Sequence, residues 1–124
     1  MVRHGQRGDQ CPKLAAQYAG HPDPILTKIG HQQAIETGDY LVQRFKQIEE
    51  TEGKAIDQVI VKSSPFIRTM ATCARICTQI KIDEVDLDYH YCEWLSTYLY
   101  SKNPIPKLEV RKKNGPELDE EFDL

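Results

Sequence analysis

The chain has 124 residues, a formal net charge of −3, 40% hydrophobic residues and 28% charged residues. This length and composition are typical of one soluble globular domain and argue against wholesale disorder. No apolar run is long enough to cross a membrane, and the first residues lack the apolar core of a secretory signal. The acidic balance also argues against general nucleic-acid binding, which needs a basic surface.

Four cysteines stand at positions 11, 73, 77 and 92. Because no secretory signal precedes them, we interpret them as thiols of a reducing compartment and expect the protein in the cytoplasm. Cys73 and Cys77 would share one face of a helix, which raises the question of a metal site. Neither a CxxC pair nor a histidine at ligand spacing accompanies them, so we expect buried thiols and no metal.

The first half of the chain predicts a loop followed by a long helix. Residues 8–26 are rich in Gly, Pro, Asp and Gln, which indicates a loop. Thr27 is suited to cap the helix that follows, and Gly53 is suited to end it. Between them, apolar or small residues recur at spacings of four and three, which predicts one buried stripe. Its members are Ala34, Gly38, Leu41, Phe45 and Ile48.

The second half predicts a strand, a helix and a further extended stretch. The β-branched run at residues 58–61 predicts a buried strand. Ser64 is placed to cap the next helix, with Pro65 at its first position. Alternating apolar residues predict a second extended stretch at residues 85–91. The stripe of the second helix comprises Ile67, Met70, Ala71, Ala74 and Cys77.

The order of these elements predicts an α/β domain over residues 1–100, with at least part of a parallel sheet. The composition changes after Tyr100. Residues 101–124 combine prolines, a basic cluster and an acidic end, so we predict an extended charged tail or loop there.

Arg3-His4-Gly5 is the first segment with chemical meaning. If the first residues end a strand, His4 lies at its carboxyl end, where open α/β sheets bind ligands. Arg3 and Arg7 would supply guanidinium groups suited to phosphate oxygens. Arg68 lies in the first turn of the helix after the next strand, so it would reach the same edge. These like charges would repel one another unless an anion offset them, which predicts an anion site.

Four ordered segments resemble the histidine phosphatase superfamily, which includes the cofactor-dependent phosphoglycerate mutases. Each is similar to a family motif, and together they cover residues 2 to about 95. The segments are Arg3-His4-Gly5, the Leu-Thr-x-x-Gly-x-x-Gln-Ala pattern at residues 26–34, the Ser-Ser-Pro-x-x-Arg pattern at residues 63–68 with Thr72 and Ala74, and Cys92-Glu93-Trp94.

The resemblance implies a three-layer phosphoglycerate mutase-like α/β fold with a mostly parallel sheet. It also implies phosphatase chemistry without metal or cofactor, on a phosphorylated small molecule or phosphoprotein. His4 would attack phosphorus as a neutral imidazole and become a phosphohistidine. Arg3, Arg7 and Arg68 would bind the phosphoryl oxygens, and Arg3 and Arg68 would also be catalytic. Glu93 would protonate the leaving oxygen and later help activate water, which requires a raised pKa.

The chain departs from the family pattern because the family has a second essential histidine late in the chain. None of His21, His31 and His90 lies in a matching motif. We therefore expect a truncated form of the fold, with a hydrophobic parallel edge exposed. Two hypotheses stay open. One is an enzyme acting through phosphorylated His4, a metal-independent phosphomonoesterase in preference to a mutase. The other is a truncated, weakly active or inactive phosphatase-like module of a larger assembly, with a structural or phosphate-binding role and a protein partner completing its sheet.

Overall fold

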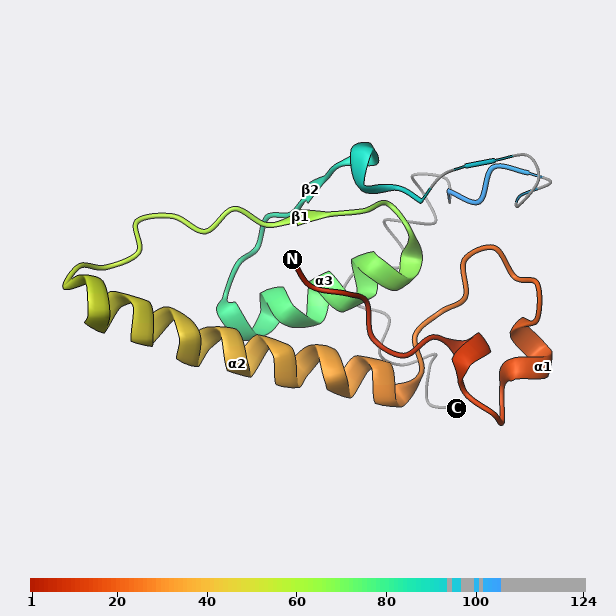
Figure 1. Cartoon of the computed structure of the whole chain (residues 1–124), viewed down its shortest axis with the longest axis horizontal. Coiled ribbons are helices and arrows are strands. Elements are labelled where there is room, and N and C mark those ends of the chain that lie inside the picture. The colour runs from red at the N-terminus through yellow and green to blue at the C-terminus, as the bar shows by residue number, and fades with distance from the viewer. Residues whose placement is uncertain (94, 97–99, 101, 106–124) are drawn as a thin grey trace.

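The computed structural model describes residues 1–93, 95, 96, 100 and 102–105 (Figure 1). Its two long helices run side by side along one side of a two-stranded sheet (Figure 1). In chain order the elements are η1 (Gly8–Gln10), α1 (Ala15–Tyr18), α2 (Lys28–Glu52), β1 (Lys62–Ser63), α3 (Ile67–Ile80), β2 (Asp86–Leu87) and η2 (Tyr89–Tyr91). The predicted α/β class with a parallel strand pair is therefore confirmed. The loop predicted at residues 8–26 contains the two short helices η1 and α1.

Helix α2 begins and ends as predicted. The Thr27 hydroxyl accepts a hydrogen bond from the Gly30 N–H at 3.0 Å, which satisfies one free donor of the first turn. Gly53 adopts the left-handed conformation, with φ 68°, and its N–H donates to the Glu49 carbonyl. Glycine takes this conformation without a steric penalty, so the sequence stops the helix there.

The buried stripe of α2 is confirmed only over its first half. Gly38 lies so close to α3 that an added Cβ would be 2.6 Å from the Gln79 Cβ. Both helices run in the same direction (Figure 1), and α3 ends at Ile80, immediately after this crossing. Ile48, farther along α2, is 37% exposed. The later part of the predicted stripe is therefore less buried because α3 does not extend beside it.

The strand predicted at residues 58–61 is wrong in both position and burial. The paired strand is β1, which lies parallel to β2 with Lys62 opposite Asp86 and Ser63 opposite Leu87. The Val61 carbonyl accepts from the Asp86 N–H at 3.0 Å, but no described segment pairs with residues 58–60. Ile60 is 67% exposed. A β-branched run forms a strand only where a neighbour satisfies its backbone, and β2 reaches no farther.

The second predicted extended stretch is confirmed only in part. Residues 85–91 contain β2, but η2 replaces the extended backbone from Tyr89 onward. The Asp88 carboxylate accepts from the His90 N–H at 3.0 Å, which favours this turn. The first residues of the chain also form no strand, and Arg7 makes an isolated antiparallel bridge with Leu26.

Helix α3 starts two residues later than predicted, and the side chain that caps it comes from a residue far away in the sequence. Its N-cap is Phe66, and Ser64 provides no cap. The Ile67 N–H instead donates to the Asp23 carboxylate at 2.7 Å. Of the predicted stripe, Ala71 and Cys77 are buried. Arg68, Thr72 and Ile76 are also buried, so the inner face of α3 is more polar than apolar spacing alone indicated.

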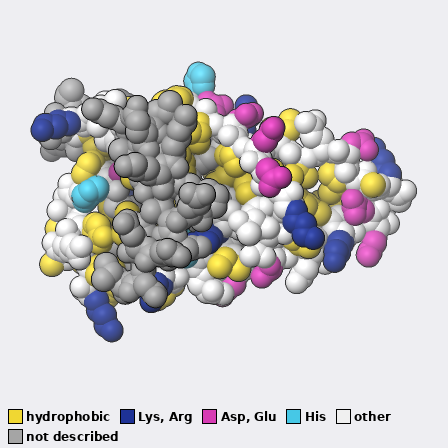
Figure 2. All heavy atoms as spheres, turned by 180° about the vertical axis from the view of Figure 1, so that it is seen from behind, with side chains coloured by type: hydrophobic (Ala, Val, Ile, Leu, Met, Phe, Trp, Pro, Cys, Tyr) yellow, Lys and Arg dark blue, Asp and Glu magenta, His cyan; other side chains and the backbone are white. Residues whose placement is uncertain are grey.

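The hydrophobic core lies between α2, α3 and the loop that precedes α2. Its buried members are Leu26, Ala34, Phe66, Ala71, Ile76 and Cys77. Over the described residues, no helix is both long enough and apolar enough to cross a membrane. Seen from behind, acidic and basic side chains are mixed over the end of the molecule that carries the last turns of α2 (Figure 2). Trp94 and most of the predicted tail at residues 101–124 lie outside the described residues.

The close crossing at Gly38 predicts a large cost for any side chain there. Replacing Gly38 by Leu should lower the free energy of unfolding by about 2 kcal/mol, because the added atoms overlap Gln79 and push α3 away. Gln43→Leu is the matched control at an exposed position of α2, and it should change stability by less than about 0.5 kcal/mol. Urea unfolding followed by circular dichroism measures both values. Equal effects would show that the helices do not meet at Gly38.

Candidate active site

The backbone around Gly5 is fixed against both long helices. The Gly5 N–H donates to the Thr72 hydroxyl at 3.0 Å, and that hydroxyl donates to the Arg68 carbonyl at 2.9 Å. A Cβ on Gly5 would lie 2.3 Å from the Gly30 carbonyl oxygen, so only glycine permits this approach. His4 is therefore positioned by this crossing. The expectation that a strand end carries His4 is wrong, because the first residues make no strand pairing.

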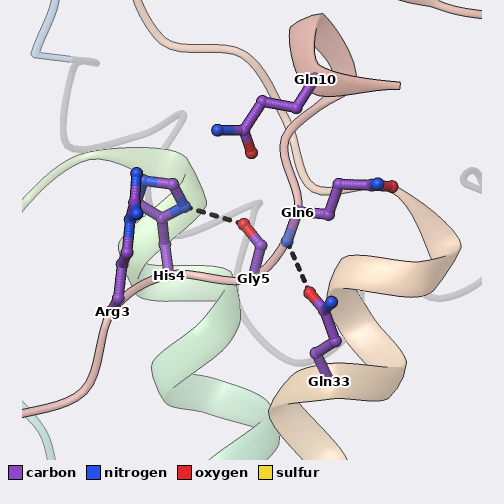
Figure 3. A pocket seen from close by; sticks show the side chains of 6 residues that line it. All are labelled: Arg3, His4, Gly5, Gln6, Gln10 and Gln33. Atoms are coloured by element: carbon purple, nitrogen blue, oxygen red, sulfur yellow. Dashed lines mark hydrogen bonds between the residues drawn. The ribbon is translucent and has the colours of Figure 1, made fainter. Parts of the chain in front are cut away.

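An open pocket of about 290 Å³ lies beside this crossing (Figure 3). The Arg3 and His4 side chains stand next to each other on one side of it, and Gln10 reaches toward them from η1 (Figure 3). The Gln10 side-chain oxygen accepts from the Arg7 N–H at 3.0 Å, which leaves its NH₂ group as the end that can donate. The lining residues are Arg3, His4, Gly5, Gln6, Gln10 and Gln33. Donor groups of this kind suit a ligand rich in oxygen acceptors.

The hydrogen bond of His4 determines which ring nitrogen is nucleophilic. Nδ1 lies 2.8 Å from the Gly5 carbonyl oxygen. A carbonyl can only accept, so Nδ1 carries the proton and Nε2 of the neutral ring keeps its lone pair.

The surroundings of His4 keep the ring neutral. Burial lowers the pKa of His4 below its ordinary value, and the hydrogen bond to Gly5 partly opposes this shift. The positive charges of three arginines lower the pKa further. These are Arg68, Arg7 and Arg3. His4 thus has the protonation state that nucleophilic attack requires.

Arg68 is a buried cation held by two carboxylates. Its side chain is 3% exposed, and Nη1 donates to Asp23 Oδ1 at 3.0 Å. Nη2 donates to Glu93 Oε1 at 2.7 Å, and the guanidinium carbon lies 4.3 Å from the centre of the Phe66 ring. Nε is buried and has no hydrogen-bond partner among the described residues. The Asp23 side chain is as buried as Arg68, at 4% exposed, so the pair compensates charge inside the protein.

The contacts of Glu93 favour its ionised form. Its Oε1 binds Arg68, and its Oε2 accepts from the Tyr100 hydroxyl at 2.7 Å. The Tyr100 hydrogen bond and the charges of Arg68 and Arg7 lower the pKa of Glu93, although partial burial opposes them. The pKa of Glu93 is thus shifted in the direction opposite to the raised value implied for a proton donor.

Arg7 is paired with Asp9. Nε donates to Oδ1 at 2.9 Å and Nη2 to Oδ2 at 2.6 Å, in a fork typical of arginine and carboxylate. Asp9, Asp23 and Glu93 thus already offset Arg7 and Arg68. The expectation that a bound anion must do so is wrong for these two arginines. Arg3 has no carboxylate partner in the described part of the chain, so its charge remains available in the pocket.

The structure brings the predicted site residues together in two groups. Arg3 and His4 line the pocket, while Arg68 and Glu93 form an ion pair. Arg7 and Arg68 link the groups, because their charges shift the pKa values of both His4 and Glu93.

Sequence reasoning assigned no role to several residues that organise this site. They are Asp23, Thr72, Tyr100 and Gln10. The sequence could have singled out Asp23, because it is the one acidic residue between positions 10 and 35 and lies between two prolines. Thr72 fell within a matching family segment, but its bond to Gly5 spans 67 positions of sequence and could not be predicted from that pattern. No motif contains Tyr100, whose contact is with Glu93.

Cys73 and Cys77 form a thiol pair on α3. Their sulfur atoms are 3.9 Å apart, and burial together with the neighbouring Cys77 raises the pKa of Cys73 to about 12. Within the described ranges, no three His, Cys, Asp or Glu side chains gather as a metal site.

Comparison with known proteins identifies one family. The family model described as histidine phosphatase superfamily (branch 1) matches residues 1–96. Neither a curated protein nor a solved structure matches the chain. The match covers the pocket residues and the three ion pairs that Arg7 and Arg68 form with Asp9, Asp23 and Glu93.

Removing Asp23 should destabilise the whole fold. Asp23→Ala leaves Arg68 buried without its main counter-charge and removes the cap of α3, so we expect a loss of about 3 kcal/mol in unfolding free energy. Asp9→Ala is the control, since its pair with Arg7 is partly exposed and should contribute less than about 1 kcal/mol. Thermal and urea unfolding measure both. A mild effect at Asp23 would contradict the buried pair.

His4 should titrate below the ordinary histidine value of about 6.5. Because its folded-state pKa is lowered, the neutral ring should persist to a lower pH than in a free peptide. Nitrogen NMR of the histidine rings measures the midpoint and the tautomer, and His4→Gln assigns the signal. We expect a protonated Nδ1 and an unprotonated Nε2. The opposite tautomer, or a midpoint above 6.5, would contradict the assignment.

Proposed function

Because the chain belongs to the histidine phosphatase superfamily (branch 1), we propose that it is a metal-independent phosphomonoesterase that works through a phosphohistidine on His4. The observation that carries the proposal is the His4 ring itself. Its Nδ1 is bound to the Gly5 carbonyl, its pKa is lowered, and it lines an open pocket with Arg3. These features leave Nε2 ready to attack phosphorus.

The first step transfers the phosphoryl group to the protein. His4 Nε2 forms a bond to phosphorus while the bond from phosphorus to the leaving oxygen breaks. Arg3 and the Gln10 amide are placed to bind phosphoryl oxygens from the pocket side. In the second step water attacks phosphorus, the bond to Nε2 breaks, and inorganic phosphate leaves.

Glu93 needs a change of state to act as the proton donor. A phosphoryl dianion close to Arg68 would compete with Glu93 for the guanidinium, and its negative charge would raise the pKa of the carboxyl. The Glu93 side chain is 53% exposed, whereas the Asp23 side chain is buried, so the dianion would displace Glu93 from Arg68 and break its hydrogen bonds before it displaced Asp23. We therefore assign protonation of the leaving oxygen, and later activation of water, to Glu93 after substrate binds.

The substrate class in this proposal is a phosphorylated small molecule or phosphoprotein. The open, donor-lined pocket supports a phosphate ester in general and favours neither class. We also propose the cytoplasm as the location, because the four cysteines are free thiols, as is typical of a reducing compartment.

A second candidate function is a phosphatase-like module whose sheet is completed by a protein partner. The observation that favours it is the extended run at residues 58–60, which has no partner strand within the described residues and exposes Ile60. Such a module would bind phosphate with little or no turnover. Chemical trapping of a phosphorylated intermediate separates the two functions.

A reactive, radiolabelled acyl phosphate should label His4. The label should survive base and be lost in acid, as expected for phosphohistidine. His4→Gln should abolish it and reduce turnover at least about a thousandfold. His90→Gln is the control, because its ring is almost fully exposed, and it should retain the label. No label on a protein that still binds vanadate would reject the phosphatase and favour the binding module.

A further inference from the structure

Tyr100 makes a direct contact with the proposed proton donor, although it lies beyond the 1–96 family match. Its hydroxyl donates to Glu93 Oε2 at 2.7 Å. Its own N–H donates to the Ser96 carbonyl at 3.0 Å. Tyr100 as a residue is partly exposed, and its hydrogen bond to Glu93 lies at the surface of the protein.

The two oxygens of Glu93 are held by different parts of the molecule. Oε1 accepts from Arg68, which is itself fixed by Asp23 and by the face of the Phe66 ring. Oε2 accepts from Tyr100. With one hydrogen bond only, a carboxylate that is half exposed could rotate about its terminal torsion. With both, its plane and its distance from Arg68 are fixed.

We infer that Tyr100 is a positioning residue that keeps the carboxylate of Glu93 against Arg68. Its relevance to catalysis rests on the proposed function, but the contact itself does not. Tyr100 is not among the residues given for the pocket lining, and within the described part of the chain its side-chain hydrogen bond goes to Glu93, so it would act through Glu93. Its effect is to set the orientation of the carboxyl and the pH at which that carboxyl takes up a proton.

The groups around Glu93 and Tyr100 determine the direction in which Tyr100 shifts the pKa of Glu93. Arg68 and Arg7 face Glu93, while Arg68 and Asp23 act on Tyr100. The hydrogen bond from the phenol stabilises the ionised carboxylate, so it lowers the pKa of Glu93 and raises the pKa of Tyr100. Removing the phenolic hydroxyl should therefore move the pKa of Glu93 upward while both arginines remain in place.

The same loss should change turnover in a way that depends on the leaving group. With Tyr100→Phe, the limb of the pH profile that requires protonated Glu93 should extend to higher pH. An alkyl phosphate needs a proton on its leaving oxygen, whereas a nitrophenyl phosphate does not. The ratio of the two rates should therefore change several-fold in the variant, and a general loss of folding would lower both rates equally.

The test is a carboxyl ¹³C NMR titration of the full chain, with Glu93→Gln to assign the signal. We expect the Glu93 midpoint to rise in Tyr100→Phe and to stay unchanged in Tyr91→Phe, a control tyrosine two residues from Glu93 that is 59% exposed. An unchanged midpoint in Tyr100→Phe would overturn the inference. A raised midpoint in a protein without any phosphatase turnover would support the positioning role and reject the proposed function, so the two fail separately.

Discussion

The buried ion pair between Arg68 and Asp23 is the interaction on which the other features of the site depend. A guanidinium that is withdrawn from water needs a fixed counter-charge, and Asp23 provides it from a loop 45 positions away. The same carboxylate caps α3, so one side chain joins the loop before α2 to the start of the second helix. Arg68 then anchors Glu93, and its carbonyl accepts from Thr72. Loss of Asp23 would remove both the cap of α3 and the counter-charge that fixes the guanidinium bound to Glu93.

The position of His4 follows from a backbone crossing. Gly5 and Gly30 approach so closely that neither can carry a side chain. The Thr72 hydroxyl also accepts a hydrogen bond from the Gly5 N–H. This arrangement replaces the strand pairing that open α/β sheets normally use to present a ligand-binding turn. It also explains why Gly5 and Gly30 both fall within motifs of the family. Both glycines are required because two backbone segments touch at this point. Neither glycine is required by the proposed chemistry of His4.

The sequence predicted features that depend on a few neighbouring residues. It did not predict contacts between distant segments. Thr27 and Gly53 marked the ends of α2 because a cap and a left-handed stop act within one turn of the chain. The sequence pattern also grouped Arg3, His4, Arg7 and Arg68, whereas Glu93 was assigned only through the resemblance to the family. The prediction of a strand at residues 58–61 was wrong because a strand needs a neighbouring strand to pair with, and β2 pairs only with Lys62 and Ser63. The ionised state of Glu93 was equally hidden, since it depends on a tyrosine and two arginines brought together by folding.

The parallel packing of α2 and α3 divides the longer helix into two parts with different support. Up to Gly38 the helix shares a core with α3, and this part carries Gly30 and the contact of His31 with Arg75. Beyond the end of α3, the remaining turns depend mainly on their own hydrogen bonds and on Glu49, which accepts from the Ile56 N–H at 2.9 Å. Local opening therefore costs least at that end. The far turns can fray, or be lengthened or shortened in evolution, without disturbing the geometry around His4.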